Sequence, residues 1–174
     1  MLVRPLIALS IASTETNPEP QGKEKKSLKE FCINLGVALS ELGHTLIICS
    51  PFDDSADYWT FKGFVQGDPK KNSIDIHYVA TEQVCTKIEK LERNVEGAIN
   101  KFPHNRPVDE SESLAYDWLL CQLHALESCD AIVAIGGKFN GAANMLLLLA
   151  EEKQKSLLPF TFMSGAASLS FHRQ

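Results

Sequence analysis

The fold of this chain is decided by residues 130–145, which read DAIVAIGGKFNGAANM. Residues 131–135 are all apolar, which is typical of a parallel strand buried on both faces. A parallel strand that leads through glycines into a helix offers free backbone N–H groups and the positive end of a helix dipole. The segment therefore predicts an anion site, with nucleotide binding as the leading functional class. The residues that would form it are Gly136, Gly137, Lys138, Asn140, Gly141 and Ala142.

A simpler interpretation of this turn stays open, because paired glycines can serve only to relieve steric conflict between a strand and a helix. A second turn of small residues, Ser164-Gly165-Ala166-Ala167, favours a ligand site. The spacing matches neither G-x-x-x-x-G-K-[ST] nor G-x-G-x-x-G. The sequence therefore argues against a standard triphosphate or dinucleotide site.

The size and charge of the chain define its broad class. Its 174 residues predict one domain, and 44% hydrophobic with 22% charged residues are ordinary for a globular protein. The formal net charge of -5 argues against broad nucleic-acid affinity, which depends on Lys and Arg that neutralise phosphates. We therefore expect no nucleic-acid partner.

The cysteines and histidines are scattered rather than paired in metal-binding motifs. The five cysteines form no C-x-x-C pair, and such free thiols are typical of a reducing cytosol. We expect no metal, no cofactor and a cytoplasmic location. No apolar run is long enough to span a membrane, so we expect no membrane partner either.

The order of predicted elements indicates an α/β, Rossmann-like fold with a mainly parallel sheet of about five strands flanked by helices. We expect a single domain over residues 1–174. Predicted strands cover residues 3–9, 45–49, 74–79, 131–135 and 157–163, and predicted helices cover 25–42, 81–99, 114–126, 141–153 and a segment from 164 onward.

Residues 50–72 are predicted to be a long loop with several aromatic side chains. Loops of this length inside a domain are usually functional or disordered. Trp59 or Phe61 could stack on a base. The alternative, which stays open, is that the aromatic residues pack on the core without a ligand.

Three segments carry a resemblance to a known family: SIAS at residues 10–13, SCDAIVAIGGK at 128–138 and PFTFMSGAA at 159–167. Together they resemble the SLOG superfamily, which includes LOG-type phosphoribohydrolases, DNA-processing proteins and nucleotide-sensing domains. The resemblance implies a ligand at the carboxyl ends of the strands, as is general for open α/β sheets.

Two departures from the enzyme pattern point away from catalysis. The LOG-type enzymes carry a G-G-x-G-T-x-x-E motif with a catalytic Glu and an Arg on the preceding helix. Met145 and Cys121 occupy these two positions here, and neither supplies the proton transfer that N-glycosidic cleavage needs. The resemblance then implies a non-catalytic sensor of an ADP-ribose-like or cyclic nucleotide signal, related to the sensors of Thoeris anti-phage systems, that regulates an effector as a homo-oligomer.

The leading hypothesis is therefore a nucleotide sensor, either a module of a larger protein or one that acts on a separate partner. The first alternative is an N-glycosidic-bond hydrolase or transferase that uses Asp53, Asp54 or Glu82, and the second is an interaction domain whose aromatic loop fills the pocket. The predicted ligand-binding residues are Ser10, Ala12, Ser13, Ser50, Gly136, Gly137, Lys138, Asn140, Gly141, Ala142, Ser164, Gly165 and Ala166.

Overall fold

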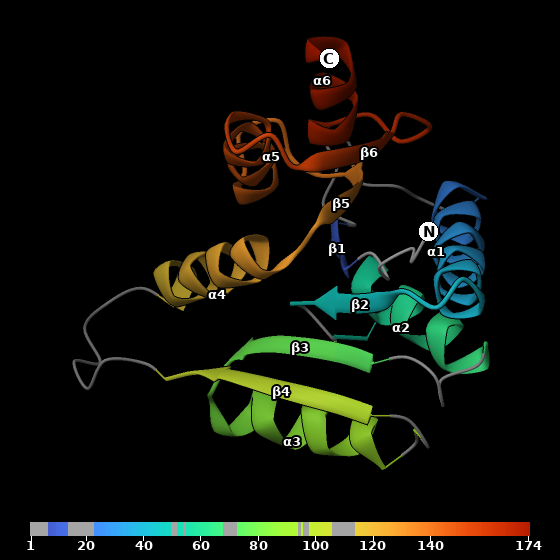
Figure 1. Cartoon of the computed structure of the whole chain (residues 1–174), viewed down its shortest axis with the longest axis vertical. Helices are drawn as coiled ribbons and strands as arrows, with labels where there is room; N and C mark the ends of the chain where they lie inside the picture. The colour runs from blue at the N-terminus through green and yellow to red at the C-terminus, as the bar shows by residue number, and fades with distance from the viewer. Residues whose placement is uncertain are drawn as a thin grey trace, which may run out of the picture.

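A computed structural model describes residues 7–13, 23–49, 52–53, 55–67, 73–93, 95, 98–105 and 114–174. Strands and helices alternate along the whole chain (Figure 1). The elements are β1 (Ile7–Ser13), α1 (Lys23–Glu41), β2 (Thr45–Ile48), α2 (Ala56–Gln66), β3 (Ser73–Val79), α3 (Glu82–Glu92), β4 (Ala98–His104), α4 (Leu114–Ser128), β5 (Ala131–Gly136), α5 (Ala142–Glu152), β6 (Ser156–Phe160) and α6 (Ala166–Arg173).

The strands form one six-stranded sheet in the order β4-β3-β2-β1-β5-β6, and every neighbouring pair is parallel. The chain adds strands outward from β1 to β4 and then returns to the other side of β1 with β5. The direction of winding therefore changes between β1 and β5. In open α/β sheets, ligands bind at such a switch point, beyond the carboxyl ends of the strands.

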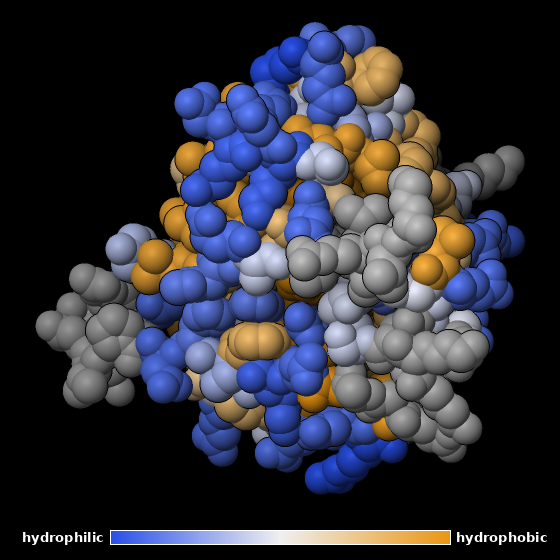
Figure 2. Space-filling model, in the orientation of Figure 1, coloured by the Kyte–Doolittle hydropathy of each residue, from blue (hydrophilic) through white to orange (hydrophobic). Residues whose placement is uncertain are grey.

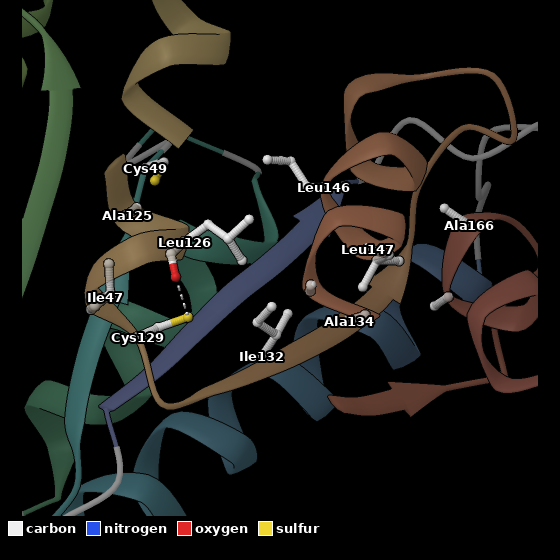
Figure 3. Packing of buried hydrophobic residues seen from close by; sticks show 12 residues of the cluster. Ile47, Cys49, Ala125, Leu126, Cys129, Ile132, Ala134, Leu146, Leu147 and Ala166 are labelled. Atoms are coloured by element: carbon white, nitrogen blue, oxygen red, sulfur yellow. Dashed lines mark hydrogen bonds between the residues drawn. The ribbon is translucent and has the colours of Figure 1, made fainter. Parts of the chain in front are cut away.

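The two faces of the sheet carry different helices. Alternate side chains of β5 point to opposite faces, as the pleat requires. Val133 and Ile135 pack in a cluster with α1 and α2, whereas Ile132 and Ala134 pack with α4, α5 and α6. Figure 3 shows this second cluster, in which Leu146 and Leu147 of α5 lie over β5. Helix α3 joins the first face, where Val84 and Ile88 pack with residues of β2, β3 and α2.

Helices α1 and α2 approach each other closely because each has a glycine at the crossing. A Cβ atom at Gly36 would lie 2.1 Å from the Thr60 carbonyl oxygen, and one at Gly63 would lie 1.9 Å from the Ile33 carbonyl oxygen. Neither distance is sterically allowed, so the backbones touch where any side chain would separate them. This face of the molecule is therefore closed by helix-to-helix contact.

The predicted α/β fold with a parallel sheet is confirmed, but the sheet has six strands rather than about five. The missed strand is β4. Its first residues were assigned to the predicted helix that ends at residue 99, and its remaining residues were assigned to no strand or helix. It is an edge strand with the sequence AINKFPH. A strand paired on one side tolerates polar residues and a proline, which hides the usual apolar pattern.

Two further boundaries were wrong. The first strand ends at Ser13 instead of residue 9, so Ser10 lies inside it rather than at its end, while residues 3–6 of the predicted strand lie outside the described residues. The predicted loop at 50–72 contains helix α2, in which Trp59 and Phe61 are buried. The alternative in which these aromatic residues pack on the core is therefore correct, and neither can stack on a base. Within the described residues, no helix combines the length and apolar character that crossing a membrane requires.

Candidate functional site

The candidate site lies at the switch point of the sheet, where the loops after β5 and β6 meet. Ser13 at the end of β1 pairs with Gly136 at the end of β5, so both strands end at the same edge. Gly136, Gly137 and Gly165 have positive φ angles of 65°, 88° and 119°. These angles favour glycine, so the backbone of both loops takes paths that other residues adopt rarely.

The two loops are in direct contact. The backbone N–H of Ala166 donates to the carbonyl oxygen of Gly137 at 3.0 Å. A Cβ at Gly165 would lie 2.1 Å from that same oxygen, and a Cβ at Gly137 would lie 2.9 Å from the Cβ of Ala143. Small residues are therefore required for the first turns of α5 and α6 to come together here.

The N-termini of α5 and α6 lack side-chain caps. Gly141 and Gly165 are the N-cap residues, neither makes a side-chain capping hydrogen bond, and the first turns hold no acidic residue. In α5 the Met145 N–H donates to the Gly141 carbonyl at 3.3 Å. The N–H groups of residues 142–144 precede this first helical hydrogen bond and therefore have no acceptor within the helix. Such N–H groups and the positive end of the helix dipole favour an anion.

Helices α2 and α3 begin differently. Ser55 accepts a hydrogen bond from the Tyr58 N–H at 3.1 Å, and Thr81 accepts one from the Val84 N–H at 3.4 Å. Asp57 and Glu82 also place carboxyl groups in these first turns. The starts of α2 and α3 are thus capped by side chains, whereas α5 has no side-chain cap and α6 has only the backbone hydrogen bond from Ala166 to Gly137.

Next to the N-terminus of α5 is an open groove of about 370 Å³ between α4 and α5. Most of its lining residues are apolar, and Asn140 and Asn144 are the polar ones. Phe139 is 38% exposed and Met145 is 41% exposed, so both present apolar surface to a ligand. Apolar side chains also gather on the surface around α5 and β6 (Figure 2). The groove is lined by Ala115, Leu119, Phe139, Asn140, Gly141, Ala142, Asn144, Met145 and Leu148.

Two positive side chains, Arg173 and Lys138, lie in the elements that form this edge. Arg173 donates to Glu151 at 2.8 Å and to Asn144 at 3.4 Å. The hydrogen bond with Arg173 lowers the pKa of the Glu151 carboxyl. The negative charge of this carboxylate balances the positive charge of the Arg173 guanidinium. Lys138 is exposed in the loop between β5 and α5. Of the two cations, Lys138 is the one that lies in the loop leading into the N-terminus of α5.

The structure brings most of the predicted site residues to this edge. The backbones of Ala12 and Ser13 lie at the end of β1 beside β5, and Lys138, Asn140 and Ser164 are exposed in the two loops. Ser10 is an exception, because it pairs with Val133 in the middle of β5. Ser50 and Asp54 lie outside the described residues. Sequence analysis missed the groove residues Phe139 and Leu119. The sequence position of Phe139, between a glycine turn and the start of a helix, could have identified it as a residue of the site.

Among the described residues tied to the enzyme hypothesis, Cys121, Met145 and Glu82 lie in different surroundings. Cys121 is fully buried, whereas Met145 lines the groove. Glu82 begins α3, on the other face of the sheet from α5. Among the described residues, no group of three or more His, Cys, Asp or Glu side chains is arranged to hold a metal ion.

Comparisons with known proteins identify the fold. No protein-family model and no curated protein matches the chain. DNA processing protein A from Helicobacter pylori, whose structure was described for its single-stranded DNA binding mode, is similar with a TM-score of 0.64 and 13% identity over 97% of this chain and 73% of that one. The DNA processing protein A from Streptococcus pneumoniae gives a TM-score of 0.59 and 11% identity over 97% of this chain and 55% of its own. The chain thus shares their Rossmann-like fold.

These neighbours overturn two predictions. The assignment as a nucleotide sensor was wrong, because the likeness is to proteins of the DNA-processing branch, one of which binds single-stranded DNA. The exclusion of a nucleic-acid partner was also wrong. It rested on the net charge of -5. Net charge describes long-range attraction to phosphates and does not describe a local site built from backbone N–H groups.

Proposed function

We propose that this domain binds single-stranded DNA at the switch-point edge of its sheet. A backbone phosphate would lie on the uncapped N-termini of α5 and α6, and a neighbouring base would enter the groove between α4 and α5. The observation that carries the proposal is the adjacency of an anion site and an apolar groove. A nucleotide within a single strand has the same two parts, a phosphate and a flat apolar base.

The phosphate half of the proposal is supported by the helix starts. The hydrogen bond from the Ala166 N–H to the Gly137 carbonyl holds the first turns of α5 and α6 at one edge, and the N–H groups of residues 142–144 in α5 would contact the phosphate. Lys138 adds a positive charge in the same loop. Backbone N–H groups at a helix N-terminus bind phosphate without a cluster of basic side chains. This explains how an acidic chain can bind a nucleic acid.

The base half is supported by Phe139 and the groove. Aromatic side chains that stack with bases are the common feature of proteins that bind single strands, because every base has a flat π face. In a duplex the bases are already stacked on one another and cannot enter such a groove. The geometry therefore favours a single strand over a duplex.

The test is fluorescence anisotropy with a labelled single-stranded oligonucleotide, compared with the same sequence as a duplex and as RNA, at about 50 mM salt. We expect binding of the single strand in preference to the duplex. Phe139→Ala should weaken it about five- to a hundredfold, since one base–aromatic stack contributes roughly 1–3 kcal/mol. Phe171→Ala is the matched control, because Phe171 is 53% exposed on α6 and does not line the groove.

Two results would contradict the proposal. One is the absence of single-strand binding at low salt. The other is an equal effect of Phe139→Ala and Phe171→Ala, which would place the strand outside the groove. Preference for RNA over DNA would keep the site and replace the substrate.

A further inference from the structure

A second cavity, of about 250 Å³, opens between α4 and the carboxyl end of β4. It is lined by Pro103, His104, Asn105, Asp117, Leu120 and His124. The α4 residues of this cavity and those of the groove, Ala115 and Leu119, project from opposite sides of a helix with 3.6 residues per turn. Helix α4 therefore forms a wall of both cavities, and both lie at the carboxyl edge of the sheet.

Two of the lining residues belong to a column of four stacked rings. The ring of His77 stacks on that of Phe102, with centroids 4.6 Å apart, and on that of His104, with centroids 5.5 Å apart. The His104 ring stacks in turn on His124, at 4.9 Å, and His124 is exposed at the end of the column. Burial and the neighbouring His124 lower the pKa of His104, so this ring is uncharged at neutral pH. Nucleobases stack on such rings, so the column offers a platform for a flat ligand.

Asp117 gives this cavity a chemistry opposite to that of the anion site at α5. The residue is only 5% exposed, and neither Lys nor Arg is among the described residues that line the cavity. A carboxylate repels phosphate and accepts hydrogen bonds at two oxygens without donating any. The volume is below the roughly 300–1,000 Å³ of sites for drug-sized ligands. The cavity therefore suits a single flat group that offers two N–H donors, rather than a whole nucleotide with its phosphate.

We propose that this cavity binds a guanine base of the single strand, with the Asp117 carboxylate accepting from the N1–H and N2–H groups of the base. Guanine is the one DNA base whose Watson–Crick edge carries two neighbouring N–H donors, so it alone matches both carboxylate oxygens. The Asn105 amide would donate to O6, and the base would stack on the His124 ring. A strand in the groove reaches the cavity by crossing α4, a helix about 10–12 Å across. The inference rests on the proposed single-strand binding and adds a base preference to it.

The experiment measures the anisotropy of three labelled oligothymidylates at about 50 mM salt. One contains a single central deoxyguanosine, one contains deoxyinosine at that position, and one contains thymidine throughout. We expect the guanine strand to bind about five- to a hundredfold more tightly than the thymine strand, the range for one bidentate base contact. Hypoxanthine, the base of deoxyinosine, lacks the 2-amino group, so the inosine strand should lose most of this preference. This comparison needs no change in the protein.

Two variants assign the preference to the carboxylate. Asp117→Asn should abolish it, although the loss of a negative charge by itself favours DNA. Asp130→Asn is the matched control, because Asp130 is exposed and does not line the cavity, and it should keep the preference.

Three outcomes would overturn the guanine inference and leave single-strand binding intact: equal affinity for the guanine and thymine strands, equal affinity for the guanine and inosine strands, or an unchanged preference in Asp117→Asn. Absence of binding by all three strands would instead contradict the proposed function, and the guanine inference with it.

Discussion

The two faces of the sheet differ in how closely their helices pack: α1 and α2 are in backbone contact on one face, whereas a groove separates α4 from α5 on the other. Glycines at positions 36 and 63 let α1 and α2 touch along their backbones. Helices α4 and α5 leave a groove between them, with Phe139 and Met145 partly exposed in it. Helix starts differ in the same sense, since α2 is capped by Ser55 and α5 is not capped by a side chain. The first face is closed by contacts that stabilise the fold, while the second leaves apolar surface and N–H groups available to a ligand.

The largest expected effect comes from a methyl group on the closed face. Gly63→Ala should lower the free energy of unfolding by about 3 kcal/mol or more, because its Cβ would lie 1.9 Å from the Ile33 carbonyl oxygen and force α1 away from α2. Urea denaturation measures this change. Gly141→Ala is the control on the open face, where the new Cβ would meet only Lys138 and should cost less than about 1 kcal/mol. Similar losses at both positions would remove the distinction between the faces.

The next effect concerns the joint that holds α4 on the sheet. His77 is buried and bonds to His104 (3.3 Å between Nδ1 and Nε2), and the His104 ring stacks on that of His124 in α4. Burial and the neighbouring imidazoles lower the pKa of His77 from 6.5 to about 4. Between these values the unfolded chain binds more protons than the folded one, so stability present above pH 6.5 is lost as pH falls toward 4. We expect a loss of roughly 2–3 kcal/mol by pH 4.5.

Urea unfolding at pH 7.5 and pH 4.5 measures this loss. In His77→Gln the same pH change should have a smaller effect, because the residue that resists protonation is gone. His172→Gln, at the end of α6, should retain the full pH dependence. If His77→Gln and the unmodified chain lose equal stability, other groups control the acid sensitivity of the joint.

A capping side chain at the start of α5 tests the difference between the capped start of α2 and the start of α5, which has no side-chain cap. Gly141→Asp should make α5 resemble α2, since the carboxylate can accept from the first-turn N–H groups and oppose the helix dipole. We expect a gain of a few tenths of a kcal/mol in stability and about a tenfold loss of affinity for single-stranded DNA, measured by anisotropy. Gly141→Ala controls for the added Cβ and should change affinity less. Unchanged affinity in Gly141→Asp would show that no phosphate lies on this helix end.

The smallest effect is expected from the loop lysine. Lys138→Ala should weaken single-strand binding about three- to tenfold without a change in the unfolding free energy, because an exposed lysine contributes charge rather than packing. The slope of log affinity against log salt should fall by about 0.7, the value for one phosphate contact on a single strand. Lys62→Ala on α2 is the control and should leave the affinity for the single strand and the salt slope unchanged. An unaltered salt slope in Lys138→Ala would place the phosphate elsewhere.

The sequence by itself determined the α/β architecture and the central element of the site. Residues 131–135 are apolar throughout, and a strand buried on both faces needs no tertiary information to be identified. The glycines after it predicted the turn into α5 for the same local reason. Edge strand β4 escaped detection, because a strand paired on one side is compatible with a polar sequence that contains proline.

Only the tertiary structure decided which aromatic residues lie in the groove and which are buried. Trp59 and Phe61 were candidates for base stacking, yet α2 buries both against the sheet. Phe139 is exposed because α4 and α5 do not close over it. Cys49 packs in one cluster with Ala125 and Leu126 of α4, although these residues are far apart along the chain. Local sequence specifies the period of each element, whereas burial and contact depend on which elements pack together, and that packing is set by the whole fold.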